Sequence, residues 1–283
     1  MEVQCERKYQ LAYLLFSMLV HTLGLFNFSA VISLRMYYDM ANCKQDYFMK
    51  FGYSFKYGSL LNATCQLIYN LIALMVDLMT FSSYTQDAPP RWLTVRSFIR
   101  STIALPFGFY TCARFWLFTW LKLKIMGVDC YPNWFRHFLF TVNPFLLICD
   151  VFCCKGDAPG SIVALVVINI LCSMYFVWLH VIYQFTGVWA VAFIKDFTFP
   201  GKLVGYIFIA LTVYINFLIG KLLNNILWNE EYVSHIPCLS DYVSAPPRFV
   251  YGYPSKDSAT FGKYLSGTAS MFIDRPNKKK TPK

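Results

Sequence analysis

Six long apolar stretches dominate this 283-residue sequence. They cover residues 10–33, 57–81, 97–121, 135–154, 161–185 and 203–228. Each is about 20 residues or longer, which as a helix is enough to cross a hydrocarbon core of roughly 30 Å. In lipid, only helices and closed barrels satisfy their own backbone groups, and runs of this length are typical of helices. The sequence therefore predicts an all-α integral membrane protein, a bundle of about six transmembrane helices.

Composition supports this prediction and excludes another class. Hydrophobic residues make up 57% of the chain and charged residues only 14%, whereas a soluble domain carries about 25% charged residues. The net charge of +10 comes from lysines and arginines in short loops and in the C-terminal tail, as is usual in membrane proteins. The sequence contains no nucleic-acid-binding module. We therefore expect the bilayer as a partner, and no nucleic acid.

The placement of basic residues also predicts an orientation. With an even number of crossings both termini lie on one side, and that side carries more lysine and arginine than the opposite loops. The positive-inside rule then predicts cytosolic termini, in the endoplasmic reticulum or the plasma membrane. Residues 1–229 form the predicted transmembrane domain. The basic segment 230–283 is expected to be an extended or disordered tail.

A stripe of polar residues follows the second apolar stretch. Its members are Ser59, Asn62, Gln66, Asn70 and Asp77. At about 100° per residue these positions fall on one helix face, which should look at the bundle interior or at a wet cavity. The three amides are expected either to join helices through hydrogen bonds or to line a wet pocket. Asp77 is expected to be an interface carboxylate or the partner of an arginine such as Arg91 or Arg96.

Hydrolysis by a hydroxyl nucleophile needs a base, usually histidine, within hydrogen-bond reach. Of four histidines, only His137 lies at the predicted depth of Ser59. Arg114, inside the third stretch, is expected to bind a carboxylate of a lipid or substrate, or to pair with Asp150.

Known catalytic motifs of soluble enzymes do not occur in the chain. It has no G-x-S-x-G, no H-E-x-x-H and no glycine-rich phosphate loop, so soluble hydrolases, metalloproteases and kinases lack support. The cysteine spacings match no metal site. We expect neither a metal nor a cofactor.

A series of short motifs carries a family resemblance. In chain order they are Phe55-Lys56-Tyr57-Gly58-Ser59 with Gln66 and Asp77, Leu105-Pro106, Phe115-Trp116, Tyr131-Pro132, Asn143-Pro144-Phe145-Leu146-Leu147-Ile148, Thr186-Gly187-Val188-Trp189 and Leu222-Leu223-Asn224-Asn225-Ile226-Leu227-Trp228. Over roughly residues 50–229 the chain resembles the androgen-induced membrane protein family, which includes the androgen-dependent regulator of tissue factor pathway inhibitor. Each motif is short, but the ordered series is fairly specific.

The resemblance implies a six-helix hydrolase of fatty acid esters of hydroxy fatty acids. The family's nucleophile is a threonine seven residues before a glutamine; here that position is Ser59, before Gln66, and it keeps the hydroxyl. The family's histidine closes an H-x-x-H-T motif. Here His137 matches the first histidine, and Phe140 stands where the second, catalytic one belongs; counting back from Pro144 gives Leu139 instead. On either count that histidine is missing. His137 lies one turn, about 5.4 Å, from the position of Phe140 on roughly the same face.

Two functions from different classes follow. In the first, the chain is a lipid-ester hydrolase with Ser59 as nucleophile and His137 as base. Asn62 and Gln66 would then orient the hydroxyl or stabilise an oxyanion, and Arg114 would hold the lipid or fatty acid ester substrate. In the second, the chain is a divergent member that has lost its base and binds a lipid or a partner. A small transporter or channel is a third interpretation, which needs a continuous polar path. The sequence does not set the oligomeric state.

Overall fold

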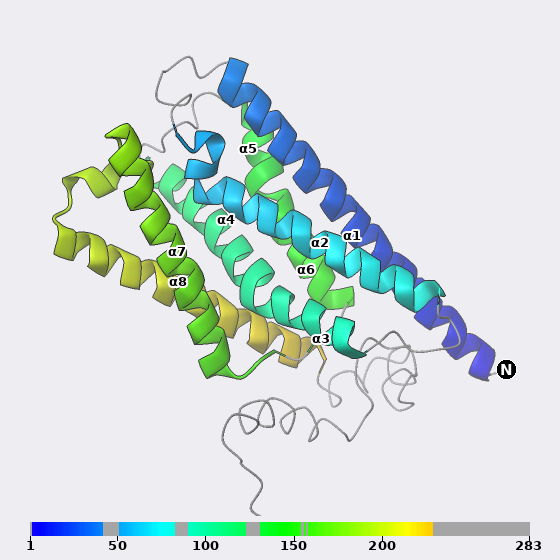
Figure 1. Ribbon diagram of the computed structural model, residues 1–283. Coiled ribbons are helices and arrows are strands. Elements are labelled where there is room, and N and C mark those ends of the chain that lie inside the picture. The colour runs from blue at the N-terminus through cyan, green and yellow to red at the C-terminus, as the bar shows by residue number, and fades with distance from the viewer. Residues whose placement is uncertain are drawn as a thin grey trace, which may run out of the picture.

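The computed structural model of the chain describes residues 2–41, 51–82, 90–122, 131–153, 156 and 158–228 (Figure 1). Within these ranges the regular structure is helical and contains no strand, which confirms the predicted all-α class. The elements are α1 (Glu2–Ala41), η1 (Tyr53–Lys56), α2 (Gly58–Ser82), α3 (Pro90–Ile99), η2 (Arg100–Ala104), α4 (Leu105–Trp120), α5 (Asn133–Phe140), α6 (Val142–Cys153), α7 (Ser161–Thr186), η4 (Ala192–Asp196) and α8 (Phe199–Leu227). The predicted tail, 230–283, lies outside the described residues.

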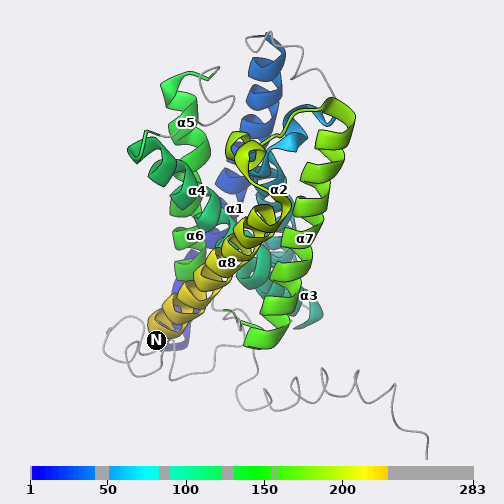
Figure 2. The ribbon, with the colours of Figure 1, turned by 90° about the vertical axis from the view of Figure 1, so that its left-hand side faces the viewer.

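Five stretches of the described chain are long and apolar enough to cross a membrane. They are Leu11–Ala41, Gly58–Phe81, Asn133–Cys153, Ser161–Thr186 and Phe199–Leu227. The remaining predicted stretch is helical as well, but it is divided into α3, η2 and α4. The start of α1 and the end of α8 lie at the same end of the bundle (Figure 2), as an even number of crossings requires. The chain is a multi-pass membrane bundle.

Two prolines account for the interruptions inside these stretches. Pro106 has no N–H to offer the carbonyl of Thr102, and the turn that leads to it is a π-helix. Pro144 likewise leaves the carbonyl of Phe140 without its helical partner. Accordingly α5 ends at Phe140 and α6 begins at Val142. The interruption at Pro144 is therefore a break between two helices, and it separates the periodicity of α5 from that of α6.

The antiparallel helices α1 and α2 pack closely along their length. Gly24 of α1 lies against Asn70 of α2, so near that a Cβ at Gly24 would lie 2.2 Å from the Asn70 Oδ1 atom. Two turns further along α1, Val31 packs in one cluster with Ala63. The Gly24–Asn70 approach and this shared cluster are consistent with one register of α1 on α2. Helix α1 also contacts α6. Elsewhere in the bundle, α8 packs against both α4 and α7 (Figure 1).

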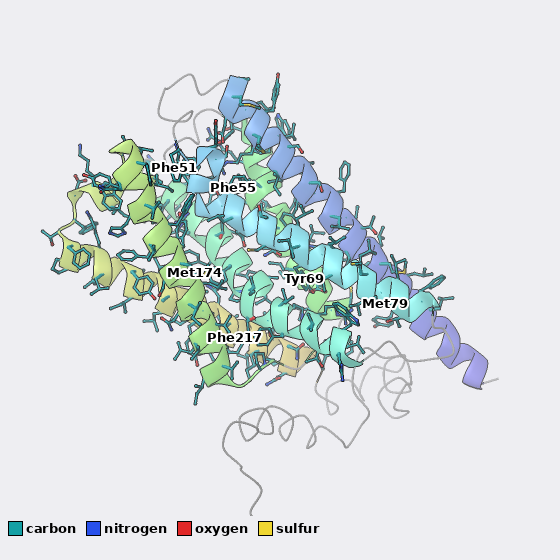
Figure 3. All side chains as sticks on the ribbon, in the orientation of Figure 1. Phe51, Phe55, Tyr69, Met79, Met174 and Phe217 are labelled. Atoms are coloured by element: carbon teal, nitrogen blue, oxygen red, sulfur yellow. The ribbon has the colours of Figure 1, made fainter. Side chains whose placement is uncertain are left out.

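Polarity is distributed as lipid requires, with apolar side chains outside and charges inside. Phe26, Ile162 and Phe208 project from α1, α7 and α8 with about 70% or more of each side chain exposed. Figure 3 likewise shows Met174 on the outer surface of α7, where it is largely exposed. By contrast, 21 polar or charged residues of the described chain are buried. The bundle interior is therefore where any polar chemistry must take place.

Candidate functional site

Ser59 lies in the first turn of α2 and is buried. Its hydroxyl oxygen accepts a hydrogen bond of 2.8 Å from Nη1 of Arg35 on α1. The same α1–α2 register that joins Gly24 to Asn70 brings these two residues together. The rings of Tyr57 and Tyr131 flank the guanidinium, with centroids 5.0 and 5.2 Å from its Cζ atom. A permanent cation, packed between aromatic faces, therefore holds the candidate nucleophile.

Asp39 provides the negative charge beside Arg35. Its Oδ2 atom lies 3.8 Å from Nε of Arg35. The carboxylate also accepts hydrogen bonds from the hydroxyls of Ser54 and Tyr131. Burial raises the pKa of the Tyr131 phenol, so that hydroxyl stays protonated and can donate. Asp39 is thus occupied by three neighbours, from α1, from η1 and from the segment just before α5.

Tyr175 joins α7 to the start of α2. Its hydroxyl accepts a hydrogen bond of 3.0 Å from the backbone N–H of Gly58 and lies 3.4 Å from the carbonyl of Lys56. A Cβ at Gly58 would lie only 3.3 Å from the Tyr175 ring. The residue before Ser59 is therefore held against α7 by its backbone.

The amides of Asn62 and Gln66 lie deeper in the bundle. Nε2 of Gln66 donates to the Ala104 carbonyl at 2.6 Å and lies 3.4 Å from Oδ1 of Asn62. The Ala104 carbonyl is at the end of the π-helix, so the widened turn supplies the acceptor. Asn70 bonds to the Gln66 carbonyl of its own helix at 2.8 Å. The amides were predicted either to join helices or to line a wet pocket. Gln66 shows the first role, because its hydrogen bond to Ala104 links α2 to η2.

His137 is exposed at the surface of α5. Its Nδ1 atom lies 3.3 Å from the Thr141 hydroxyl, and its ring lies 5.0 Å from that of Trp116. Phe140, in contrast, is buried and stacks on Phe115 with ring centroids 3.8 Å apart. The structure therefore gives Ser59 an arginine as its hydrogen-bond partner, and a pairing with His137 remains a prediction that requires α5 to turn.

Arg114 of α4 is half-buried, with its Cζ atom 5.6 Å from the centroid of the Tyr110 ring. Its predicted pairing with Asp150 is wrong, because the Asp150 carboxylate is taken by two other residues. The Oδ1 atom of Asp150 lies 3.0 Å from Nε2 of His21, and the Oδ2 atom of Asp150 accepts a hydrogen bond from the Tyr69 hydroxyl. Among the ion pairs of the described chain, none includes Arg114.

A second polar cluster, of which the sequence indicated only the pairing of Asp77 with an arginine, lies nearer the other end of the bundle. His21 of α1 is fully buried between two carboxylates, with Nδ1 2.7 Å from Asp77 and Nε2 3.0 Å from Asp150. Arg96 and Ser17 also donate to Asp77, at 3.0 and 2.8 Å. The predicted pairing of Asp77 with Arg96 is therefore confirmed. The spacing of Ser17 and His21, four residues apart inside an apolar stretch, is the signal that could have indicated the cluster.

Comparison with known families now gives these sites a context. A family model described as FAR-17a/AIG1-like protein matches residues 16–225. The chain belongs to the FAR-17a/AIG1-like family. The match runs from α1 into α8 and includes both polar clusters of this FAR-17a/AIG1-like protein, which confirms the family resemblance read from the sequence motifs. No curated protein matches the chain, and no solved structure does.

Proposed function

We propose that this FAR-17a/AIG1-like protein binds a fatty acid within the bilayer, with its carboxylate beside Ser59. The observation that carries the proposal is the excess of positive charge at this place. Arg35 and Arg114 contribute two guanidinium groups, whereas Asp39 is the only acid that ion-pairs with either among the described residues. A lipid carboxylate would supply the missing negative charge in a setting where an unpaired cation is costly.

Tyr175 supports a site that includes both arginines. Its phenol contacts the backbone of Gly58, next to Ser59, and the charges of Arg114 and Arg35 both act on that phenol. We infer that a fatty acid entering from the bilayer would meet Arg114 of α4 as well as the Arg35–Ser59 pair.

Ester hydrolysis by Ser59 is the second candidate function. The favouring observation is the buried hydroxyl with a cationic donor at 2.8 Å, since a guanidinium stabilises the negative charge that forms on an alkoxide or a tetrahedral oxyanion. In this reaction the Ser59 oxygen would bond to the ester carbonyl carbon, the alcohol would leave with a proton, and water would release the acid. His137 would be the base, assisted by Asn62 and Gln66, only after α5 turns inward. We rank this function second because Phe140 packs in the place of the family's histidine.

The cellular setting is part of the same proposal. The excess of lysine and arginine at the ends that carry the termini supports cytosolic termini, in the endoplasmic reticulum or the plasma membrane.

Photo-crosslinking tests the proposed binding. Purified protein in lipid nanodiscs is exposed to a diazirine-bearing fatty acid or to its methyl ester, and the adducts are mapped by mass spectrometry. We expect the acid to label α2 and α4 near Ser59 and Arg114 more strongly than the ester does, because only the acid carries a charge. Equal labelling by the two probes, or labelling spread evenly over the outer surface, would remove the proposal.

A further inference from the structure

Three buried amide side chains carry polar atoms for which the described residues provide no hydrogen-bond partner. They are Asn27 of α1, Gln66 of α2 and Asn143 of α6, each at most 3% exposed. The atoms concerned are Nδ2 and Oδ1 of Asn27, Oε1 of Gln66 and Oδ1 of Asn143. An unpaired polar group costs free energy in any protein interior, and buried amides normally find a partner. Such a concentration of unpaired atoms therefore points to a ligand.

The register of α1 on α2 puts Asn27 at the height of Gln66. Asn27 lies midway along α1 between Gly24, which contacts Asn70, and Val31, which packs with Ala63. The position opposite it on α2 thus lies midway between Ala63 and Asn70, directly beside Gln66.

Gly108 of α4 brings the third amide to the same place. A Cβ at Gly108 would lie 2.8 Å from Nε2 of Gln66 and 3.6 Å from Nδ2 of Asn143. The absence of a side chain at Gly108 therefore allows amides from α2 and α6 to approach one another across α4. Four helices meet at this height, around a polar centre.

The hydrogen bonds that do form set which atoms remain free. Nε2 of Gln66 is taken by the Ala104 carbonyl at 2.6 Å, and Nδ2 of Asn143 lies 3.6 Å from the Cys112 sulfur. Two amide oxygens are left as acceptors, while Asn27 offers one donor and one acceptor. A ligand for this set must both donate and accept. A bare metal cation would use the oxygens but leave the Asn27 N–H group unpaired.

We propose that Asn27, Gln66 and Asn143 bind ordered water in the middle of the bundle. One water molecule can donate to the oxygens of Gln66 and Asn143 and accept from Nδ2 of Asn27, which gives it the roughly three partners typical of a buried water. A second water molecule can donate to Oδ1 of Asn27, the remaining unpaired acceptor. The site lies next to Asn62, which is 3.4 Å from Gln66. Ser59, the first residue of the polar stripe on α2, lies about one helical turn before Asn62. The site therefore holds water inside the bilayer close to the polar stripe of α2. This inference does not depend on catalysis by Ser59.

Radiolytic footprinting tests the water site with two cysteines of the same chain. X-ray pulses convert bound water to hydroxyl radicals, which oxidise nearby sulfur, and mass spectrometry measures the rate for each cysteine. Cys112, next to Asn143, and Cys172, inside an apolar cluster of α7 and α8, are almost equally buried at 4% and 5% exposed. We expect Cys112 to be oxidised severalfold faster than Cys172 in the unmodified protein, and equal rates would overturn the proposal.

A stability measurement provides a second test. If water bonds to Asn27, then Asn27→Leu removes one partner of that water. We then expect both the melting temperature and the oxidation rate of Cys112 to be lower in the variant than in the unmodified protein. If the amide is dry, the same substitution removes an unpaired polar group, and the melting temperature rises. A rise would contradict the proposal. Because the comparison of Cys112 with Cys172 needs no variant, it decides the matter even if Asn27→Leu fails to fold.

Discussion

The Nη1 atom of Arg35 lies 2.8 Å from the hydroxyl oxygen of Ser59. A guanidinium donates hydrogen bonds but does not accept a proton, so this contact orients the hydroxyl without acting as a general base. At the position of the family's catalytic histidine, Phe140 stacks on Phe115. The site therefore combines a fixed positive charge with a buried hydroxyl, an arrangement suited to holding a carboxylate or an ester carbonyl.

Restoring the histidine should reveal whether the remaining geometry can still support hydrolysis. We expect Phe140→His to react with a serine-directed fluorophosphonate probe at Ser59, whereas the unmodified protein reacts weakly, because only the variant has a histidine at the buried position of α5, while His137 is exposed. The loss of the stacked Phe115 pair should lower stability by about 0.5–1.5 kcal/mol. Gel fluorescence after labelling gives the readout.

The control for this experiment is the double variant Ser59→Ala with Phe140→His, which should not be labelled. Strong labelling of Ser59 in the unmodified protein would show that a base already acts there. Hydrolysis would then become the leading function.

The buried histidine between two carboxylates should be a main source of stability. Replacing His21 with leucine leaves Asp77 and Asp150 facing each other without the ring that separates them, and breaking a buried charged pair costs about 3–5 kcal/mol. We expect a loss of this size in the free energy of unfolding, measured by denaturation in mixed micelles. Thr22→Ala is the matched control, since the exposed Thr22 hydroxyl bonds only to its own helix carbonyl at 2.7 Å. A stable His21→Leu protein would mean that the carboxylates hold a shared proton instead.

Two glycines in helices allow a direct comparison of close and open packing. A methyl group at Gly24 would lie 2.2 Å from the Asn70 side chain, whereas Gly205 of α8 has open space around it. We expect Gly24→Ala to destabilise the bundle by about 1–3 kcal/mol through overpacking. Gly205→Ala should be neutral or stabilising by up to about 1 kcal/mol, since alanine favours helices. Thermal melting of both variants gives the result.

A compensating change sharpens this comparison. Shortening the opposing side chain with Asn70→Ser in the Gly24→Ala background should recover part of the lost stability. Failure to recover any would place the strain elsewhere than at the α1–α2 contact.

Sequence patterns predicted the helices well, because length and hydropathy decide whether a segment crosses lipid. The stripe from Ser59 to Asp77 was visible for the same reason, since a period near 3.6 fixes which residues share a face. The break before Pro144 has an equally local cause, the missing N–H group of proline. All of these features depend on neighbours along one segment.

Contacts between segments were predicted less well. Depth alone placed His137 level with Ser59, but depth does not set the direction in which a side chain points around its helix. Similarly, a search for charge partners matched Arg114 with Asp150, whereas the packing of α1 against α6 gives that carboxylate to His21. These outcomes depend on how helices are rotated and which of them are neighbours, and neither is encoded in the pattern of a single stretch.

The most direct test of the lipid-binding account is the affinity of nanodisc-embedded protein for a long-chain fatty acid, compared between the unmodified chain, Arg114→Lys and Arg114→Gln. Loss of a charge-assisted hydrogen bond corresponds to about 1.5–3 kcal/mol, or roughly 10- to 100-fold in affinity. The account predicts a loss of this size for Arg114→Gln, a much smaller loss for Arg114→Lys, and no change in any variant for the methyl ester. Equal affinity of all three proteins for the acid would contradict it.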